Sequence, residues 1–514
     1  MLARINSYAL SGLNGYKVSV EVDIHAGLPG IEVVGLPDTA VKESRERMRS
    51  AIKNSGYDFT PHKITINLAP AHTKKEGSVF DLAIALGVLC ATEQGVVDEH
   101  RNPLRALEDY IFLGELSLSG SVRKINGVMP ILISARERGF KKVVIPKENA
   151  NEAKYIRGVE VYAVGSLREA VALVNASDAL PIETCDISPK SAARASEDLK
   201  YVKGQYSAKR ALEIAAAGGH NMLMIGSPGG GKTMLAKCLP GILPDMTEDE
   251  ILETTKIHSV AGILDPQAGI VTERPFRTPH HTSSKIALTG GGSTSHPGEI
   301  SYAHNGVLFL DELPEYPRGV LEILRQPLED GVITVSRAAR SVEYPADFML
   351  VASMNPCPCG YYGSAAHACS CTPSQIQKYM SRISGPLLDR IDLHIDVDEV
   401  RYDELTSDGL SESSATVKAR VNAARAVQTA RYAGTNVHSN ANMSNAMIKK
   451  YCALDAAGER ILSNAFDKLG FSARAYTRIL KVARTIADLD GSENIQSKHI
   501  AEAVMYRSLD KAVK

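Results

Sequence analysis

The segment Asn221-Met-Leu-Met-Ile-Gly-Ser-Pro-Gly-Gly-Gly-Lys-Thr233 decides the fold of this chain of 514 residues. It opens with a short apolar stretch typical of a buried strand and continues as a loop of the form G-x-x-x-x-G-K-[ST], after which a helical pattern begins. Glycines in such a loop let main-chain N–H groups close around phosphate oxygens. The segment therefore predicts a strand, a phosphate-binding loop and a helix within a parallel α/β domain.

Each residue of this loop has an expected contact with a nucleoside triphosphate. The Lys232 ammonium can reach the β- and γ-phosphate oxygens, and the Thr233 hydroxyl can hold Mg²⁺. A glycine-rich turn without a ligand is the alternative, but the motif stands in the required context between strand and helix. We therefore expect ATP and Mg²⁺ as cofactors. The residues expected to bind them are Gly226, Ser227, Pro228, Gly229, Gly230, Gly231, Lys232 and Thr233.

Two further apolar stretches end in polar side chains. Gly306-Val-Leu-Phe-Leu-Asp311-Glu312 delivers two adjacent acids, and Phe348–Ser353 leads into Asn355. Ligands gather at the carboxyl ends of parallel strands, so Asp311 is expected to bind Mg²⁺ and Glu312 to polarise the attacking water. Asn355 is a candidate sensor of the γ-phosphate. A solvated strand end is the alternative for the acids, and an ordinary turn residue is the alternative for the asparagine.

Length and composition limit the class of protein. At about 150 residues per domain, the chain is expected to hold roughly three domains. Its 58 Lys and Arg residues balance 59 Asp and Glu residues, so nucleic acid would have to bind a local patch. The eight cysteines do not resemble a secreted disulfide framework, and no signal-peptide or membrane-spanning pattern is found. We therefore expect a cytoplasmic protein without membrane contact.

The pattern of strands and helices divides the chain. Residues 1–175 alternate between strand and helix patterns, with a helix expected over 39–54 and one strand over 111–118, and residues 176–200 have the composition of a linker. Residues 201–398 form a second α/β pattern with an expected insertion at 262–305. Residues 399–514 are predominantly helical. The expected fold class is a multidomain α/β protein with a C-terminal helical domain.

Four cysteines lie close together in the sequence, between residues 357 and 371. Two C-x-C pairs can place four thiolates around one tetrahedral Zn²⁺, and His367 is a spare ligand. Free buried thiols and a redox disulfide are the alternatives. We expect a structural zinc site that stiffens this loop and takes no part in catalysis. Its expected ligands are Cys357, Cys359, Cys369 and Cys371.

Two segments carry groups that contact nucleic-acid backbones. Residues 274–285 join arginine, histidine and hydroxyl groups to Lys285 and run into a glycine-rich tip. Residues 332–344 have the pattern of a hairpin with Arg337 and Arg340 near its tip. A solvated hairpin tip is the alternative. We expect Lys285, Arg337 and Arg340 to contact DNA.

The order of these motifs, followed by Leu387-Leu-Asp-Arg-Ile-Asp392, resembles the magnesium-chelatase-like branch of the AAA+ superfamily. Over almost its whole length the chain resembles the ComM/YifB group of that branch. The resemblance implies a hexameric ring in which Arg390 is an arginine finger that reaches the ATP of a neighbouring subunit. It further implies that Arg474 is sensor 2 in a helical lid, with Arg478 one turn away as an alternative, and that Gln205 lies at the adenine.

Residues 1–175 resemble the proteolytic domain of Lon-type proteases, which use a serine nucleophile and a lysine base. The segments that carry this resemblance are 75–81, 116–129 and 142–149. Aligning them on their glycines puts Val79 and Met129 at the serine and lysine positions. Ser78 with Lys124 is the alternative pair. We therefore expect a degenerate, non-proteolytic domain that supports assembly or binds a partner.

The resemblance to the ComM/YifB group implies an ATP-dependent DNA motor, a helicase or branch-migration enzyme. It would act in the recombination of incoming DNA during natural transformation, with single-stranded or branched DNA and recombination proteins as partners. Two alternatives come from other classes. One is a chelatase-type subunit that remodels a protein partner, and the other is an ATP-dependent Lon-like protease.

Overall fold

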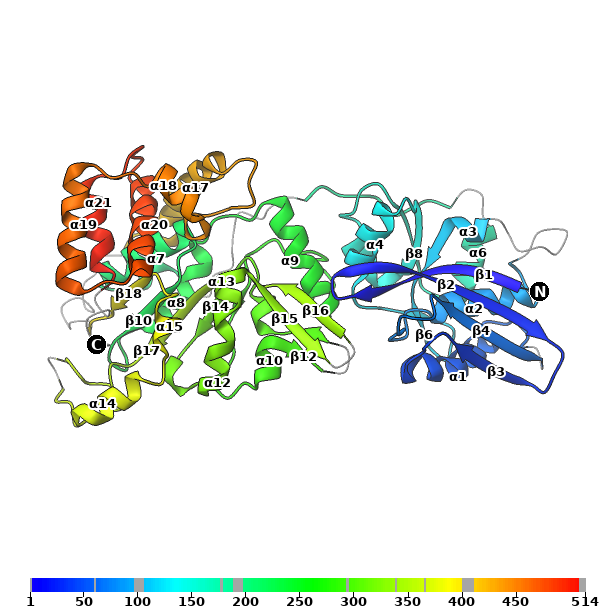
Figure 1. Ribbon diagram of the computed structural model, residues 1–514. Helices are drawn as coiled ribbons and strands as arrows, with labels where there is room; N and C mark the ends of the chain where they lie inside the picture. The colour runs from blue at the N-terminus through cyan, green and yellow to red at the C-terminus, as the bar shows by residue number, and fades with distance from the viewer. Residues whose placement is uncertain are drawn as a thin grey trace.

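The computed structural model describes residues 2–59, 62–96, 106–175, 179–187, 197–292, 295–337, 340–364, 367–399 and 411–507. The molecule is elongated, with an N-terminal lobe (residues 2–175) at one end and the C-terminal helices at the other (Figure 1). In the described part of the chain, no helix combines the length and apolar character that a membrane span requires.

The N-terminal lobe is built on a mixed seven-stranded sheet. Its alternating sequences explain the strands; in the segment around Ile64, Ile66 and Leu68, every second residue is buried. The sheet runs in the order β3 (Gly30–Val34), β4 (Lys63–Ala69), β2 (Asn14–His25), β1 (Leu2–Ser11), β5 (Tyr110–Phe112), β8 (Lys142–Pro146) and β9 (Glu160–Val164).

The helices of this lobe cover the sheet. The apolar helix α2 (Asp81–Ala91) is buried along its whole length and packs on β1 and β2. The stretch 111–118, expected as one strand, is instead divided, because the chain leaves β5 at Leu113 and turns through Gly114 with φ +155°. The other short elements and helices are α1 (Thr39–Asn54), α3 (Ala106–Asp109), β6 (Glu115–Leu116), β7 (Val122–Arg123), α4 (Val128–Glu137), α5 (Ala150–Ala153) and α6 (Leu167–Asn175).

The centre of the molecule is a parallel five-stranded sheet. Its apolar strands are buried on both faces, as expected for a sheet covered by helices. The order is β11 (Phe276–Arg277), β14 (Val307–Leu310), β17 (Met349–Met354), β10 (Met222–Ile225) and β18 (Leu393–Asp396). This order brings the carboxyl ends of β10, β14 and β17 to one edge, where the phosphate loop, the acid pair and Asn355 follow.

Helices surround this sheet, and the C-terminal helices form an all-helical bundle beside it (Figure 1). The bundle packs on α7, and one apolar core runs from the sheet into it. The helices near the sheet are α7 (Tyr206–Gly218), α8 (Lys232–Cys238), α9 (Glu248–Ala261), α10 (Lys285–Thr289), α11 (Glu299–Tyr302), α12 (Arg318–Leu321), α13 (Pro327–Asp330), α14 (Pro373–Met380) and α15 (Gly385–Leu388). The bundle consists of α17 (Ser414–Arg431), α18 (Asn445–Tyr451), α19 (Ala456–Leu469), α20 (Ala473–Leu489) and α21 (Ser497–Met505).

A hairpin and a helix join the central part to the N-terminal lobe. Helix α9 packs on α4, and the buried Glu152 carboxylate accepts a hydrogen bond from the Ser259 hydroxyl. The expected hairpin is present as β15 (Val332–Arg337) and β16 (Arg340–Pro345). Its Val342 side chain lies against Gly12 in the turn between β1 and β2, where an added Cβ would come within 2.6 Å. Smaller pairs of strands include β12 (Gly290–Gly291) with β13 (His296–Pro297).

A buried ion cluster fixes the helical bundle to the central sheet. Asp392, just before β18, accepts a hydrogen bond from the Asn221 main chain and pairs with Arg478 of α20 at 2.9 Å. Its carboxylate also lies 3.3 Å from His220 Nδ1. Burial alone would raise the pKa of Asp392, but the Arg478 charge and the His220 hydrogen bond hold that pKa below its ordinary value.

Replacing Asp392 by Asn should lower the free energy of unfolding by about 3 kcal/mol, because Arg478 then keeps a charge without its buried partner. Urea denaturation at neutral pH measures this loss. The depressed pKa makes the stabilisation present at neutral pH and lost as the pH falls through the folded-state pKa, so wild type and variant should converge in acid. Asp389→Asn is the control, because its pair with Arg474 is exposed and worth less than about 1 kcal/mol. Equal losses in the two variants would contradict the role given to Asp392.

Candidate functional site

The phosphate loop connects the buried strand β10 to helix α8. At its first glycine, Gly226, an added Cβ would lie 2.3 Å from the Val397 carbonyl oxygen, so no larger residue fits. Gly229 and Gly231 have φ of +81° and +88°, and no atom would lie within 4 Å of a Cβ added at either residue. The loop is thus held tightly at its base and open at its tip, where a ligand can approach the main chain.

Lys232 and Asn355 lie together beneath this loop. The Lys232 ammonium donates hydrogen bonds to the carbonyl oxygens of Gly226 (2.6 Å) and Ser227 (3.0 Å) and to Asn355 Oδ1 (3.1 Å). Burial lowers the pKa of Lys232, and the nearby charges of Asp311 and Glu312 oppose that shift. The lysine expected to bind phosphate and the asparagine expected to act as a sensor are therefore in direct contact.

Thr233 and Asp311 form the pair expected to hold Mg²⁺. The Thr233 hydroxyl donates to Asp311 Oδ2 at 2.8 Å. A hydroxyl and a carboxylate are the hard oxygen ligands that suit Mg²⁺, which commonly keeps several waters and binds phosphate as well. The donor set therefore fits the ion. The Ser353 hydroxyl donates to Asp311 Oδ1 and orients the carboxylate.

Ser353 was not among the expected site residues. It is a buried hydroxyl in β17, whose other residues are apolar or alanine. A single polar residue in an otherwise apolar strand was the sequence feature that could have indicated this role.

Glu312 stands at the mouth of the site. Its backbone is left-handed at φ 53°, and its N–H donates to Asp311 Oδ1 at 3.1 Å. Its side chain is 56% exposed, and the carboxylate lies 3.6 Å from His281 Nδ1. The sequence predicted that the segment containing His281 contacts a nucleic-acid backbone. The structure instead puts this side chain against the expected catalytic acid, where it can orient the carboxylate.

Gln205 also lies next to the phosphate loop. Its side-chain amide donates to the Gly230 carbonyl oxygen at 3.2 Å and to the Asp398 carbonyl. The neighbouring Lys209 ammonium donates to the Val202 carbonyl and to the Ser411 hydroxyl, so it fastens two chain segments together.

The two expected arginines lie across the sheet from the phosphate loop. Arg390 precedes β18, which runs parallel to β10, so it lies at the amino ends of the strands. Its buried guanidinium donates to the Glu329 carboxylate and to the Pro386 carbonyl. Arg474 lies nearby, 3.5 Å from Asp389, with 61% of its side chain exposed.

The Glu329 carboxylate connects these two arginines electrostatically. The Arg390 hydrogen bond lowers the pKa of Glu329, and the charge of Arg474 adds to the shift. Arg478, the alternative to Arg474, is instead committed to Asp392 inside the molecule. Arg390 and Arg474 therefore lie on the opposite side of the sheet from the phosphate loop of their own chain, and each is paired with an acid.

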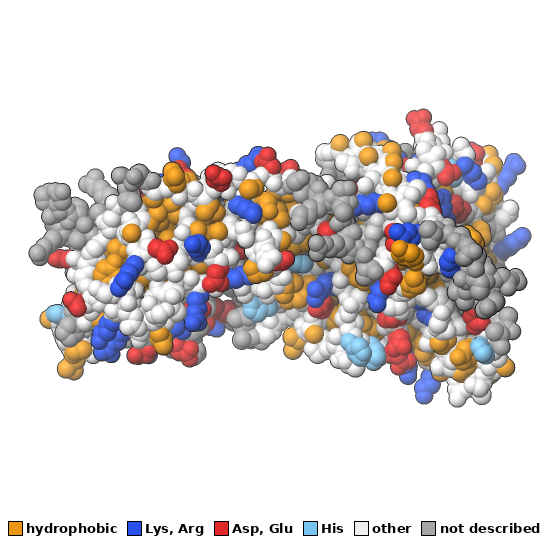
Figure 2. All heavy atoms as spheres, turned by 180° about the vertical axis from the view of Figure 1, so that it is seen from behind, with side chains coloured by type: hydrophobic (Ala, Val, Ile, Leu, Met, Phe, Trp, Pro, Cys, Tyr) orange, Lys and Arg blue, Asp and Glu red, His pale blue; other side chains and the backbone are white. Residues whose placement is uncertain are grey.

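The expected DNA contacts fall into two groups. Lys285 is exposed at the start of α10, whereas Arg274 and Arg277 of the same segment are paired with Glu250 and Glu299. Arg337 and Arg340 pair across the end of the β15–β16 hairpin, but their side chains lie outside the described part of the structure. On the face in Figure 2, Lys and Arg are interspersed with Asp and Glu.

The four clustered cysteines meet in space. Their Sγ atoms all lie within 4.8 Å of one another, and Cys357 is buried. All eight cysteines of the chain are free thiols. Main-chain hydrogen bonds from Tyr361 and Ser370 lower the pKa of Cys359 to about 5, which favours one thiolate. Desolvation and the neighbouring thiols instead raise the pKa of Cys369 and Cys371. The spare ligand His367 is exposed, with its ring 4.8 Å from that of Tyr361.

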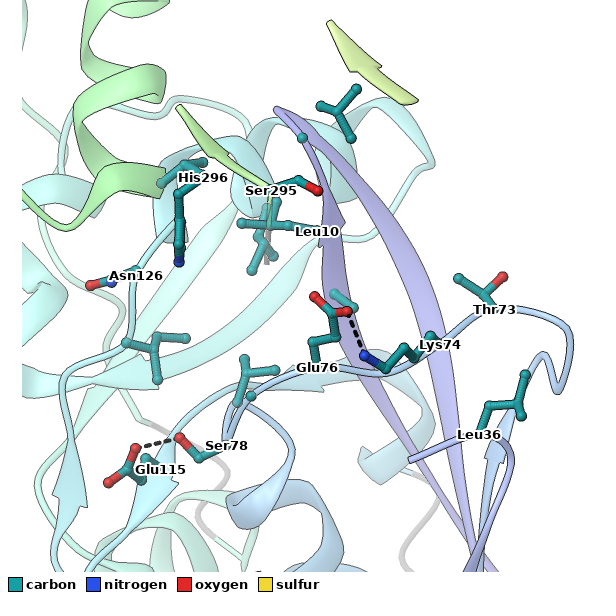
Figure 3. A pocket seen from close by; sticks show the side chains of 18 of the residues that line it. Leu10, Leu36, Thr73, Lys74, Glu76, Ser78, Glu115, Asn126, Ser295 and His296 are labelled. Carbon is teal, nitrogen blue, oxygen red and sulfur yellow. Dashed lines mark hydrogen bonds and ion pairs between the residues drawn. The ribbon is translucent and has the colours of Figure 1, made fainter. Parts of the chain in front are cut away.

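A cavity of about 840 Å³ at the junction of the lobes is lined by Ser78 and Glu115, which Figure 3 labels, and by Lys124 of the alternative serine–lysine pair. The Ser78 hydroxyl donates to the Glu115 carboxylate, so its hydrogen-bond partner among the described residues is an acid instead of an amine. Met129 is fully buried. In the described part of the lobe, Ser78 is thus bonded to an acid, whereas a Lon-type serine is activated by a lysine.

Three magnesium chelatase families match successive parts of the chain. The family described as "Magnesium chelatase, subunit ChlI" matches residues 198–405. "Subunit ChlI of Mg-chelatase" matches residues 20–149, and "Magnesium chelatase, subunit ChlI C-terminal" matches residues 411–507.

Full-length relatives are found as well. Competence protein ComM of Haemophilus influenzae is 44% identical over 99% of this chain and 98% of its own length. Protein YifB of Escherichia coli is also 44% identical, over 99% of this chain and 98% of its own length. Lon protease 2 of Bacillus subtilis is 28% identical over 185 residues, which is 32% of each chain.

Two substitutions separate binding from turnover in this site. Lys232→Ala should raise the Kd for ATP about 100-fold, because it removes the buried charge that faces the phosphate loop. Glu312→Gln should leave the Kd within about twofold and slow hydrolysis by about 10²-fold or more, because an amide cannot polarise water. Calorimetric titration and phosphate release measure the two effects. An equal loss of ATP binding in both variants would contradict the assigned roles.

Proposed function

Because this chain belongs to the ComM/YifB family of magnesium-chelatase-like proteins, we propose that it is an AAA+ ATP hydrolase that drives movement along DNA. The observation that carries the proposal is the meeting of Lys232, Thr233 and Asp311 with Asn355 and Glu312 at one edge of the parallel sheet. This combination is suited to phosphoryl transfer to water.

Each residue of the site has a distinct task in this reaction. Lys232 and the loop amides attract the phosphates, and Thr233 with Asp311 would hold Mg²⁺, which would supply positive charge beside the phosphate oxygens. Glu312 accepts a proton from the attacking water and is oriented by His281. Asn355 senses the γ-phosphate, and Gln205 lies at the adenine.

We propose that the site is completed by a second copy of the chain. Arg390 and Arg474 lie across the sheet from their own phosphate loop, so they serve the nucleotide of a neighbour. A guanidinium that enters from outside stabilises charge on the transferred phosphoryl group. Such head-to-tail contacts close into a ring, and we propose six members.

The proposed substrate is single-stranded or branched DNA in the pore of this ring. The hairpin β15–β16 with Arg337 and Arg340, together with the exposed Lys285, provides cationic groups in six copies. The name of the Haemophilus relative supports a role in competence. We propose helicase or branch-migration activity during recombination of incoming DNA, in the cytoplasm, with recombination proteins as partners.

We further propose the division of the chain that the sequence suggests. Residues 1–175 form a Lon-protease-like, non-proteolytic domain, 176–200 a linker, 201–398 the AAA+ core and 399–514 the helical lid. The resemblance to Lon protease 2 and the Ser78–Glu115 pair support the first assignment. The four clustered cysteines are proposed to hold one structural Zn²⁺.

A second candidate function is a chelatase-type subunit that remodels a protein partner. The matches to magnesium chelatase families favour it. It differs from the DNA motor in one measurable respect: ATP hydrolysis would be indifferent to DNA. Comparing hydrolysis rates with no DNA, single-stranded DNA, forked DNA and a four-way junction therefore distinguishes the two functions.

Mixing two inactive variants tests the shared site. Arg390→Ala keeps an intact phosphate loop, and Glu312→Gln keeps an intact arginine. Random mixing in equal amounts should restore about a quarter of the wild-type hydrolysis rate, because that share of head-to-tail interfaces combines an intact loop with an intact arginine. Each variant alone should remain below about 1% of wild type. Mixed rings that stay inactive would show that Arg390 acts within its own chain.

Removing the hairpin arginines tests the DNA contact. Arg337→Ala with Arg340→Ala should weaken DNA binding and reduce the salt slope by about 0.7 for each lost phosphate contact on single strands. Basal ATP hydrolysis should not change. Lys449→Ala with Lys450→Ala, which removes two exposed charges from α18, is the matched control. Fluorescence anisotropy at several salt concentrations measures the slopes, and identical slopes in both double variants would remove the hairpin from the proposal.

A further inference from the structure

We propose that zinc bound by the four clustered cysteines sets the affinity of the neighbouring nucleotide site, because the described part of the cysteine loop (357–364 and 367–371) packs on the phosphate loop through Gly360 and Pro228. The inference rests on the proposed ATP-hydrolase function. It gives the metal a regulatory task that a purely local structural site would not have.

The spacing of the sulfur atoms suits one tetrahedral Zn²⁺. A Zn–S bond of about 2.3 Å implies that sulfur atoms around the ion lie about 3.8 Å apart. The Sγ of Cys369 lies 3.7 Å from that of Cys357 and 3.6 Å from that of Cys359, and the Cys357–Cys359 distance is 3.3 Å. The fourth, Cys371, lies within 4.8 Å of all three. Small shifts therefore complete the coordination sphere.

Main-chain N–H groups support these sulfur atoms. The Tyr362 N–H donates to Cys357 Sγ at 3.3 Å, and the Cys371 N–H donates to Cys369 Sγ at 3.4 Å. Hydrogen bonds of this kind orient ligands and stabilise the thiolate charge in metal sites. The polar surroundings thus favour an ion more than a set of inert, apolar thiols.

The cysteine loop has little else to hold it. Among its described residues only Cys357 and Gly360 are buried. Of the two tyrosines at its tip, Tyr361 is partly buried and Tyr362 is 57% exposed. A segment of this length without an apolar core needs a cross-link to keep one conformation. The metal would supply that cross-link.

Two contacts transmit the position of the cysteine loop to the nucleotide site. Gly360 packs so closely on Pro228 of the phosphate loop that an added Cβ would lie 2.6 Å from the proline ring. Its N–H donates to the Cys357 carbonyl oxygen at 3.0 Å, so a metal ligand supports this contact. Cys357 in turn lies two residues after Asn355, which accepts the hydrogen bond from Lys232. Loss of the metal would therefore release both Pro228 and Asn355.

The test measures metal content and nucleotide affinity on the same full-length samples. Zinc is quantified by elemental analysis, and the Kd for ATP is measured by calorimetry before and after treatment with a chelator. Cys369→Ser removes one ligand. Cys185→Ser, an exposed cysteine outside the cluster, is the matched control. Gly360→Ala keeps all four ligands; it disturbs the contact with Pro228 and, because Gly360 has φ +89°, also strains the main chain of the cysteine loop.

We expect about one zinc per chain in wild type and in Cys185→Ser. Cys369→Ser should lose the metal and bind ATP about tenfold more weakly, since one charge-assisted contact is no longer fixed. Gly360→Ala should keep its zinc and still bind ATP more weakly, which separates coupling from loss of folding. Restoring zinc to chelated wild type should restore the affinity.

Three results would overturn the inference. Zinc-free protein that binds ATP as tightly as zinc-loaded protein would remove the coupling and leave the ATP-hydrolase proposal intact. Oxidised cysteines without zinc, found by thiol counting, would make the cluster a redox pair instead. Zinc-loaded wild type that binds no ATP at all would overturn the proposed function together with the inference.

Discussion

The parallel pairing of β10 with β17 on one side and β18 on the other is the constraint on which the site depends. The carboxyl ends of parallel strands lie at the same edge of the sheet. The pairing alone therefore places the phosphate loop, which follows β10, beside Asn355, which follows β17. The same pairing carries the segment before β18 to the opposite edge. One sheet therefore presents a phosphate-binding edge and an arginine-bearing edge, and in the proposed ring a complete site combines two chains.

The parts of the fold that are set by local sequence could be predicted. Helix α1 spans the residues 39–54 that its periodicity indicated, and the hairpin at 332–345 follows its alternating pattern. The prediction was wrong at 111–118, where a strand pattern continues in the sequence. Gly114 adopts φ +155° there, and the strand is divided at this residue. The periodicity of apolar residues indicates which side chains are buried, but it does not predict where a strand is interrupted by a turn.

Contacts between segments that are distant in the sequence could not be predicted from the sequence alone. Ser353 reads as one small residue in an apolar strand, and only the sheet brings its hydroxyl to Asp311. Arg274 and Arg277 carry the charges of a nucleic-acid contact, yet partners far along the chain neutralise them. Arg474 and Arg478 are one helical turn apart and indistinguishable by type. Burial against Asp392 separates them, and burial is a property of the folded chain.

The short segment that holds Arg390 also holds Asp392, whose carboxylate clamps α20 through Arg478. Arg390 and the C-terminal helices are therefore mechanically linked, and the ion pair between Asp389 and Arg474 adds a second connection. In the proposed ring, a tilt of the C-terminal helices in one subunit would change the position of its Arg390 relative to the nucleotide of the next subunit. Conformational changes would then pass from subunit to subunit in one direction around the ring, and the head-to-tail contact would set that direction.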